Sequence, residues 1–241
     1  MNINPELHPE TFLEILESKG SIVIENFLTP ECAEDLHNFF NGEMPKDWWY
    51  SYSYPCDGEI SSQRVMNSNY HRIISDREAA NSVLMTGNGK TGESGDISYH
   101  FYRTGNHGVG CWCKECKLKE WLLSEEMLGF MKKASGKDFK SFDTVFASKY
   151  SEGCFLSPHT DHSNGDIGFV LQLTKDWKIQ NGGLLTFMSD DKTRIESVEI
   201  PKFNSLTLFN LPGGKGKWHY VSHVNPGVKN DRLAYSGWYK I

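Results

Sequence analysis

The second part of the chain is divided into short runs of strand length, and this division constrains the fold more than any other sequence feature. Turn residues stand between the runs, for example Asn164-Gly165 and Asn181-Gly182-Gly183. Glycine and asparagine reach the left-handed backbone conformations that tight turns need. The positions of the turn residues therefore agree with the ends of the predicted strands. The runs, eight in number, cover residues 142–151, 155–162, 167–174, 184–189, 194–200, 205–211, 219–224 and 232–240. Eight consecutive short strands predict either a double-stranded β-helix, or jelly roll, or a small barrel.

Residues 1–141 show a different pattern, in which helical periodicity alternates with polar loops. We predict helices over 9–19, 29–40 and 117–133, and strands over 21–27 and 48–56. No Pro/Ser/Gly-rich linker interrupts the 241 residues, so we expect one α+β domain. In this domain, residues 1–141 form a helical and loop-rich substrate-side elaboration, with N-terminal helices packed on a jelly-roll core of residues 142–241.

Charge and hydropathy narrow the partners of the chain. The formal net charge is −6, from 25 basic and 31 acidic residues, which disfavours binding to a phosphate backbone. No apolar run approaches the roughly 20 residues that span a bilayer, and the segment Met1 to Glu10 is polar. We therefore expect a cytoplasmic protein with no nucleic-acid or membrane partner. The sequence does not define an oligomeric state.

A histidine and a carboxylate stand two residues apart in the second run of the jelly roll. In an extended chain, His159 and Asp161 project from the same face, so they can share one metal ion. A third ligand would come from the seventh run, where His219 and His223 have the same parity. Two histidines and one carboxylate with open positions suit non-heme Fe(II) that activates oxygen.

Further motifs follow in a fixed order along residues 142–240. They are Tyr150 and Gly153, the His159-Thr160-Asp161 motif, the segment 168–177, the Asn181-Gly182-Gly183 turn with Leu185, His219-x-Val221, and the R-x-x-x-S-G-W run over 232–238. Together they resemble the Fe(II)/2-oxoglutarate-dependent oxygenases of the prolyl-4-hydroxylase-like branch. The resemblance implies Fe(II), 2-oxoglutarate and O2, with ascorbate as reductant. Relatives that halogenate have a small residue in place of the carboxylate, so the presence of Asp161 implies hydroxylation.

The resemblance also implies roles for residues around the iron. Arg232 offers a bidentate fork for the far carboxylate of 2-oxoglutarate, Ser236 has the same parity, and Tyr150 matches a family tyrosine that bonds this carboxylate. We expect the strand of Arg232 to pair with the strand of the distal histidine. His219 is preferred as that histidine through its H-x-V pattern, and His223 is the alternative, since it lies nine rather than 13 residues before Arg232.

Substrate contacts are expected outside the iron and cosubstrate positions. Arg72 and Arg103 could hold a substrate carboxylate, and Trp238 stands at the end of the barrel. The ending of the chain is also similar to that of free amino acid (lysine-type) hydroxylases and halogenases, so a small substrate such as lysine is predicted. The alternatives are a peptidyl or protein (prolyl-type) hydroxylase and a non-catalytic jelly-roll binding module.

A second cluster of possible metal ligands precedes the helix predicted at 117–133. His107, Cys111, Cys113 and Cys116 supply one imidazole and three thiols within ten residues, a set that could close a tetrahedral Zn(II) site. The spacing is not that of a standard zinc finger, because one residue separates the first two cysteines. Reduced cysteines without a metal are the alternative.

Overall fold

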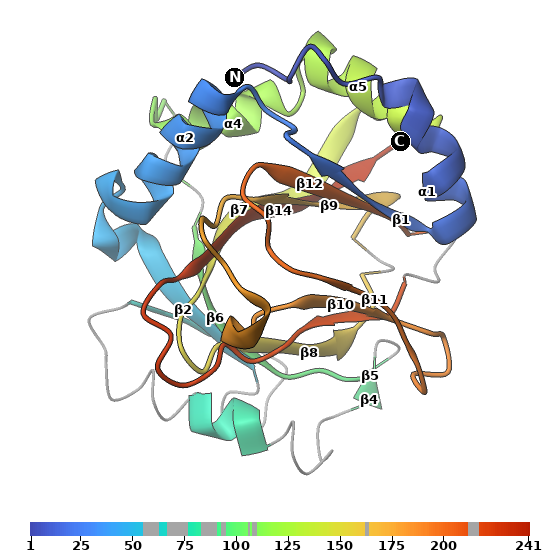
Figure 1. Cartoon of the computed structure of the whole chain (residues 1–241). Coiled ribbons are helices and arrows are strands. Elements are labelled where there is room, and N and C mark those ends of the chain that lie inside the picture. Colours follow the sequence, from blue (N-terminus) through green and yellow to red (C-terminus); the bar gives the residue numbers. More distant parts are fainter. Residues whose placement is uncertain are drawn as a thin grey trace.

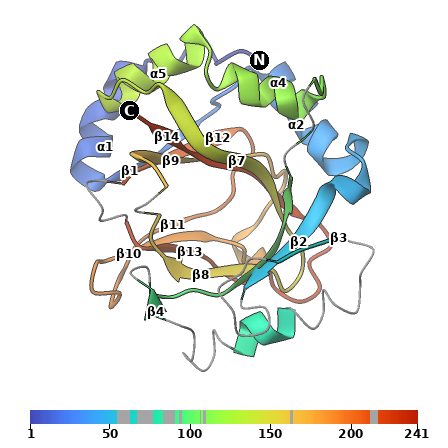
Figure 2. The same cartoon turned by 180° about the vertical axis from the view of Figure 1, so that it is seen from behind.

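The jelly roll consists of two curved β layers that face each other, with helices over the outer surface of one layer (Figures 1 and 2). The computed structural model describes residues 1–54, 63–66, 77–82, 91–92, 95–105, 107, 110–161, 164–211 and 217–241. The predicted α+β class with a double-stranded β-helix core is confirmed. All eight strands predicted between residues 142 and 240 are present.

The strands form one continuous antiparallel sheet that folds over on itself. The first layer has the order β1-β12-β9-β14-β7 and the second the order β8-β13-β10-β11. Strand β6 pairs with both β7 and β8, and so joins the layers. The strands of this sheet are β1 (Ser21–Glu25), β2 (Trp49–Tyr54), β3 (Gln63–Met66), β6 (Tyr99–Thr104), β7 (Ser141–Tyr150), β8 (Phe155–His159), β9 (Ile167–Gln172), β10 (Leu185–Met188), β11 (Ile195–Glu199), β12 (Ser205–Asn210), β13 (His219–Val221) and β14 (Arg232–Lys240).

Helices cover the first layer on its outer face, where Figure 1 shows them along the top of the molecule. The α-helices with bounds are α1 (Leu13–Lys19), α2 (Pro30–Asn38), α4 (Lys114–Trp121) and α5 (Glu125–Ser135). Shorter helical turns are η1 (Pro9–Phe12), η2 (Phe39–Glu43), η3 (Lys46–Trp48) and η4 (Ile179–Asn181), and residues 77–82 are also helical. A separate two-stranded ribbon joins β4 (Thr91–Gly92) to β5 (Gly95–Asp96). Within the described residues, no helix has the length and apolar character needed to cross a bilayer.

The alternation of side chains along β14 separates the interior into two parts. Leu233, Tyr235 and Tyr239 point outward into an apolar core shared with the helices. Arg232 and Trp238, which have the opposite parity, line the space between the two layers. The sheet therefore contributes one face to a dry core and the other face to a cavity.

The segment predicted as one helix over 117–133 is two helices. Ser124 begins α5, because its hydroxyl accepts a hydrogen bond from the Met127 amide at 3.2 Å. This side chain satisfies an amide that a continuous helix would bond to a carbonyl one turn earlier. The apolar periodicity continues through both helices, which is why it did not reveal the break.

The expected partner of the Arg232 strand is also wrong. Strand β14 pairs with β7 and β9 in the first layer, whereas His219 lies on β13 in the second layer, between β8 and β10. Arg232 and His219 therefore approach each other across the interior rather than along one sheet. Parity along each strand was correct, but parity carries no information on which strands pair.

Candidate active site

Three buried side chains from the second layer come together at one side of the interior. His159 ends β8, Asp161 follows two residues later, and His219 begins β13 as the cross-strand partner of His159. Their potential ligand atoms all lie within 4.8 Å of one another. The two imidazole Nε2 atoms lie 3.4 and 3.3 Å from the two carboxylate oxygens of Asp161. The arrangement can hold one divalent metal ion.

The backbone fixes the orientation of both imidazoles. Nδ1 of His159 lies 2.9 Å from the carbonyl oxygen of Ser157, and Nδ1 of His219 lies 2.8 Å from that of Lys217. A carbonyl only accepts, so each Nδ1 carries the proton and donates it. In the neutral imidazoles the lone pair is then on Nε2, which is the tautomer that a metal ligand requires.

The electrostatics of the cluster favour a charged carboxylate. Burial by itself would raise the pKa of Asp161, but the neighbouring His219 and His159 hold it well below its ordinary value. Burial disfavours protonated His159, yet Asp161 raises the pKa of this histidine. The site therefore provides an ionised acceptor between two imidazoles in a space away from water, as a cation site does.

A buried cation lies on the first layer, facing the same interior. Arg232 is 2% exposed and is the cross-strand partner of Tyr150. The guanidinium also lies over the Tyr150 ring, 4.9 Å from its centroid. Within the described residues, Nε of Arg232 has no hydrogen-bond partner. A buried guanidinium with an unused donor is suited to an anionic ligand.

The cluster at Asp161 and the guanidinium of Arg232 share one cavity of about 260 Å³ between the layers. Most of its wall is aromatic or aliphatic, and polar groups are few. The described lining residues are Tyr52, Ile97, Tyr99, Phe101, Arg103, Phe146, Ser148, Tyr150, Leu156, His159, Asp161, Asn164, Phe169, Val170, Leu185, Phe209, His219, Val221, Arg232, Ser236, Gly237 and Trp238. An apolar pocket with a few convergent polar groups is typical of a small-molecule site.

Comparison with known families was decisive for the jelly-roll part of the chain. Residues 145–240 match the sequence profile of the 2OG-Fe(II) oxygenase superfamily. The jelly-roll part of the chain is therefore similar to 2OG-Fe(II) oxygenases. The predicted enzyme class, a 2-oxoglutarate-dependent dioxygenase, is thereby supported, and the family implies Fe(II) and 2-oxoglutarate as cofactors with O2 and a small molecule as reactants. A search of curated proteins found no match.

Solved structures share the fold of this oxygenase at low sequence identity. A prolyl-4-hydroxylase from Pseudomonas putida has a TM-score of 0.52 and 13% identity, covering 97% of this chain and 98% of its own. An oxidoreductase of the 2OG-Fe(II) oxygenase family from Burkholderia pseudomallei has a TM-score of 0.57 and 13% identity, with coverages of 100% and 93%. A prolyl hydroxylase from Trichoplax adhaerens, solved with a hypoxia-inducible-factor peptide, has a TM-score of 0.58 and 15% identity, with coverages of 96% and 88%.

The structure separates the two candidate distal histidines of the oxygenase. His223 lies beyond the end of β13, where its Nε2 is 2.7 Å from Oδ1 of Asn81 and its ring stacks on Phe155 at 4.3 Å. His223 is not among the described residues that line the cavity. Only His219 joins the cluster with His159 and Asp161 among the described groups.

The other predicted site residues differ in their placement. Ser236, Arg103 and Trp238 all line the cavity of the oxygenase, and Arg72 lies outside the described residues. The Arg103 guanidinium is held between two rings, 4.5 Å from the centroid of Tyr52 and 4.4 Å from that of Phe146. These contacts orient the guanidinium at the wall.

Sequence analysis missed Asn164, which it interpreted only as a turn residue. Its amide nitrogen lies 3.4 Å from Oδ1 of Asp161, and its side chain lines the cavity. An Asn-Gly pair is explained by a turn alone. The sequence therefore gave no sign that Asn164 also contacts Asp161 in the cavity.

The Asn181-Gly182-Gly183 turn of the oxygenase supports the site from behind. Gly182 has a φ of +69°, and a Cβ there would lie 2.0 Å from the His223 carbonyl oxygen. A Cβ on Gly183, with a φ of +63°, would approach Cδ of Arg232 at 3.3 Å. The Trp177 indole donates a hydrogen bond to the Gly182 carbonyl at 2.8 Å. Two glycines therefore allow the chain to pass closely behind the buried arginine.

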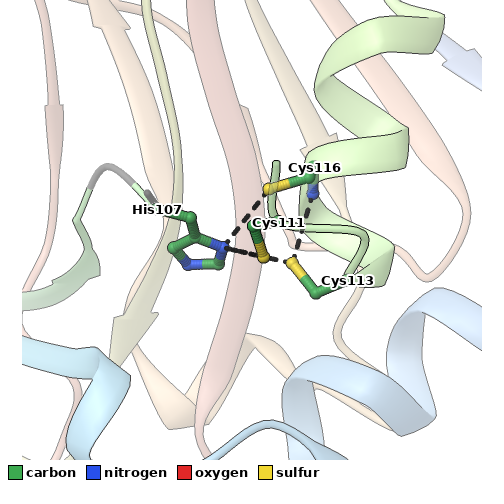
Figure 3. A group of neighbouring side chains, drawn as sticks. All are labelled: His107, Cys111, Cys113 and Cys116. Atoms are coloured by element: carbon green, nitrogen blue, oxygen red, sulfur yellow. Dashed lines mark hydrogen bonds between the residues drawn. The ribbon is translucent and has the colours of Figure 1, made fainter. Parts of the chain in front are cut away.

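The second cluster that the sequence indicated also forms. His107, Cys111, Cys113 and Cys116 place their potential ligand atoms within 4.8 Å of one another. Figure 3 shows the sulfur atoms of the three cysteines turned toward the imidazole. All four are half-buried, and none of them lines the cavity of the oxygenase. The cysteines lie before and within the first turn of α4, and the histidine follows β6.

Proposed function

We propose that the oxygenase hydroxylates an unactivated C–H bond of a small substrate, a free amino acid such as lysine. One observation carries the proposal: a single cavity joins a cluster of two histidines and one carboxylate to a buried arginine and a second, ring-held arginine. A metal, a dicarboxylate and a substrate acid each have a complementary group there. A non-catalytic binding module would not need the metal cluster and both arginines in the same cavity.

The metal would be held by His159, Asp161 and His219. When bound there, Fe(II) would supply the centre that couples decarboxylation of 2-oxoglutarate to oxidation of the substrate. The carbonyls of Ser157 and Lys217 keep the imidazole Nε2 lone pairs aimed at the ion. Three protein ligands leave open positions for the cosubstrate and O2, and ascorbate would serve as the external reductant.

The cosubstrate would lie between the two layers. Arg232 would hold the far carboxylate of 2-oxoglutarate through its guanidinium, including the Nε that lacks a partner within the described chain. The Tyr150 hydroxyl is already placed against this guanidinium and can donate to the same carboxylate. Ser236 has the same parity as Arg232 along β14 and lines the same cavity. Its hydroxyl can therefore act as a third donor to this carboxylate.

The substrate would occupy the wall formed by β6 and β14. Arg103 presents a guanidinium that two rings hold in place, and this group would bind the carboxylate of an amino acid. Trp238 contributes an indole Nε1 that is buried and lacks an acceptor in the described part of the chain. The cavity of about 260 Å³ is close to the lower end of ligand pockets, which span about 300–1,000 Å³, so the enclosed space suits small molecules.

A cationic side chain on the substrate would meet aromatic rings rather than an acid. Asp161 is the only carboxylate among the described residues that line the cavity, and it belongs to the metal cluster. Tyr52 and Tyr99 stack 5.0 Å apart at the wall beside Arg103. The faces of such rings attract an ammonium group, so a lysine side chain would be tolerated there.

A peptidyl or protein hydroxylase is the second candidate. Two of the similar folds are described as prolyl hydroxylases, one of them solved with a peptide. A peptide substrate would lay its backbone across the cavity mouth and would not need Arg103 for a free carboxylate. The same experiment therefore separates the two candidates.

The test incubates the protein with Fe(II), 2-oxoglutarate, ascorbate and either pooled free amino acids or proline- and lysine-containing peptides. Succinate and substrate mass are followed together, and we expect succinate and a gain of one oxygen with a free amino acid. Turnover with peptides alone would overturn the free amino acid assignment and support the second candidate. Absence of both turnover and an iron-dependent charge-transfer band with 2-oxoglutarate would favour the binding module.

An arginine variant tests the substrate end of the cavity. Arg103→Gln should raise the KM for the amino acid about 10- to 100-fold, as expected for loss of a charge-assisted hydrogen bond of about 1.5–3 kcal/mol. The KM for 2-oxoglutarate should stay unchanged. Arg194→Gln, at an exposed arginine, is the matched control. Equal effects of the two variants on the substrate KM would contradict the role of Arg103.

A further inference from the structure

We propose that His107, Cys111, Cys113 and Cys116 bind a structural Zn(II) ion that joins the end of β6 to the start of α4. This site is separate from the candidate iron site, and its presence does not depend on the activity proposed above. The inference rests on three features of the described chain, namely the geometry of the four ligands, the partner of the histidine, and the connections of the cluster to the core.

The ligand geometry fits a tetrahedral ion. Nδ1 of His107 lies 3.1 Å from Sγ of Cys113, 3.4 Å from that of Cys116 and 3.6 Å from that of Cys111. With Zn–S bonds of about 2.3 Å and Zn–N bonds of about 2.0 Å, tetrahedral N and S ligands lie about 3.6 Å apart. Figure 3 shows the three sulfur atoms gathered on the same side of the imidazole. Small shifts of the side chains would complete the coordination.

The other face of the imidazole has the partner that a zinc ligand needs. Nε2 of His107 lies 3.3 Å from Oε2 of Glu115, and both side chains are largely buried. A metal bound at Nδ1 forces the ring proton onto Nε2, from which it points to this carboxylate. Neither atom makes a hydrogen bond within the described chain, so both remain available for this contact when a metal is bound. Such a carboxylate–histidine–metal arrangement orients the ligand and increases its basicity.

Neighbouring groups hold two of the ligands in place. Cys113 is the N-cap of α4, and its sulfur accepts a hydrogen bond from the Cys116 amide at 3.4 Å. The Trp48 ring packs on the His107 imidazole with centroids 4.4 Å apart, which shields that side of the cluster.

The cluster is connected to the wall of the catalytic cavity. The hydroxyl of Thr104, the last residue of β6, donates to Oε1 of Glu115 at 2.5 Å and accepts from the Ala147 amide of β7 at 3.0 Å. Arg103 is the preceding residue of β6 and lines the cavity. A bound ion would therefore fix a segment that lies between the helical cover and the substrate side.

The test measures metal in the full chain after expression with Zn(II), exposure to a mild chelator and desalting. We expect about one zinc per chain in the wild type and loss of most of it in Cys116→Ser. Cys32→Ser, at a half-buried free cysteine outside the cluster, is the matched control and should keep the zinc. Asp161→Ala should also keep it, because that residue belongs to the other cluster.

A second measurement needs no variant and covers the case in which Cys116→Ser does not fold. Titration of wild-type protein with a mercurial thiol reagent should release zinc in proportion to the thiols blocked, as a metallochromic dye detects. Replacement of zinc by Co(II) should give the intense visible bands of tetrahedral thiolate coordination. Folded wild-type protein that retains no zinc and gives no such bands, or whose cysteines form a disulfide instead, would overturn the proposal.

Discussion

Replacement of Arg232 by glutamine should selectively weaken the use of 2-oxoglutarate. Arg232 is 2% exposed, and its guanidinium lies over the Tyr150 ring while its Nε lacks a partner in the described chain. Truncation of one partner in a buried, hydrogen-bonded charge pair costs about 2–5 kcal/mol. A loss of about 3 kcal/mol corresponds to roughly a 100-fold rise in the KM for 2-oxoglutarate, at about 1.4 kcal/mol per tenfold change.

The conservative variant separates charge from shape. Arg232→Lys keeps the positive charge but loses the planar fork, so we expect a smaller rise of about tenfold. The assay is succinate formation against the concentration of 2-oxoglutarate, with binding followed in parallel through the charge-transfer band of the ferrous complex. Arg103→Gln is the matched control, because it removes a guanidinium from the same cavity. A folded, iron-loaded Arg232→Gln protein with a KM within twofold of wild type would refute the reasoning.

Three further predictions concern the metal, a half-buried acid and a helix start. Asp161→Ala should lose bound iron and lower succinate formation by more than about 100-fold, since even outer-shell changes at metal sites cost about 10- to 100-fold; metal content and rate are measured together, and retained iron would contradict the assignment. Burial raises the pKa of Glu199 from 4.5 to about 7, against the lowering effects of Thr207 and Arg232. The fold therefore favours the protonated Glu199 carboxyl. Its contribution to the free energy of unfolding is present below pH 4.5 and is lost as the pH rises through 7. Glu199→Gln should be more stable than wild type above pH 7, by at most about 3 kcal/mol, and should lose this advantage near pH 4; denaturant unfolding at both pH values checks it, and an advantage that does not change with pH would contradict it. Ser124→Ala should lower the free energy of unfolding by about 1 kcal/mol through loss of the α5 cap; the same unfolding assay checks it, and an unchanged midpoint would contradict it.

Local sequence signals predicted the eight strands between residues 142 and 240 and the faces of their side chains correctly, whereas β6, which joins the two layers, was not predicted. Asn181-Gly182-Gly183 was predicted as a turn between two strands. Both of its glycines adopt the positive φ angles that such a turn needs. The common direction of Arg232, Ser236 and Trp238 follows from the two-residue period of a strand. These features depend on neighbouring residues only, so one sequence is sufficient to infer them.

The choice between His219 and His223 shows where local information ends. Both histidines have the same parity, so alternation cannot distinguish them. The difference arises because β13 ends at Val221, and because Asn81 and Phe155, which are distant in sequence, bind and cover His223. The pairing of β14 with β7 instead of β13 is likewise a non-local outcome, as no motif in either strand encodes its neighbour.

By itself, then, the sequence determined the eight strands between residues 142 and 240, the parity of the proposed ligands and the resemblance to an oxygenase family. The tertiary structure alone decided which layer each strand joins, which imidazole completes the cluster at Asp161, and that Glu115 stands behind His107. The physical reason is that backbone geometry sets the direction of a side chain within two residues. The position of that side chain in space, by contrast, depends on pairing and packing between segments that are far apart in the chain.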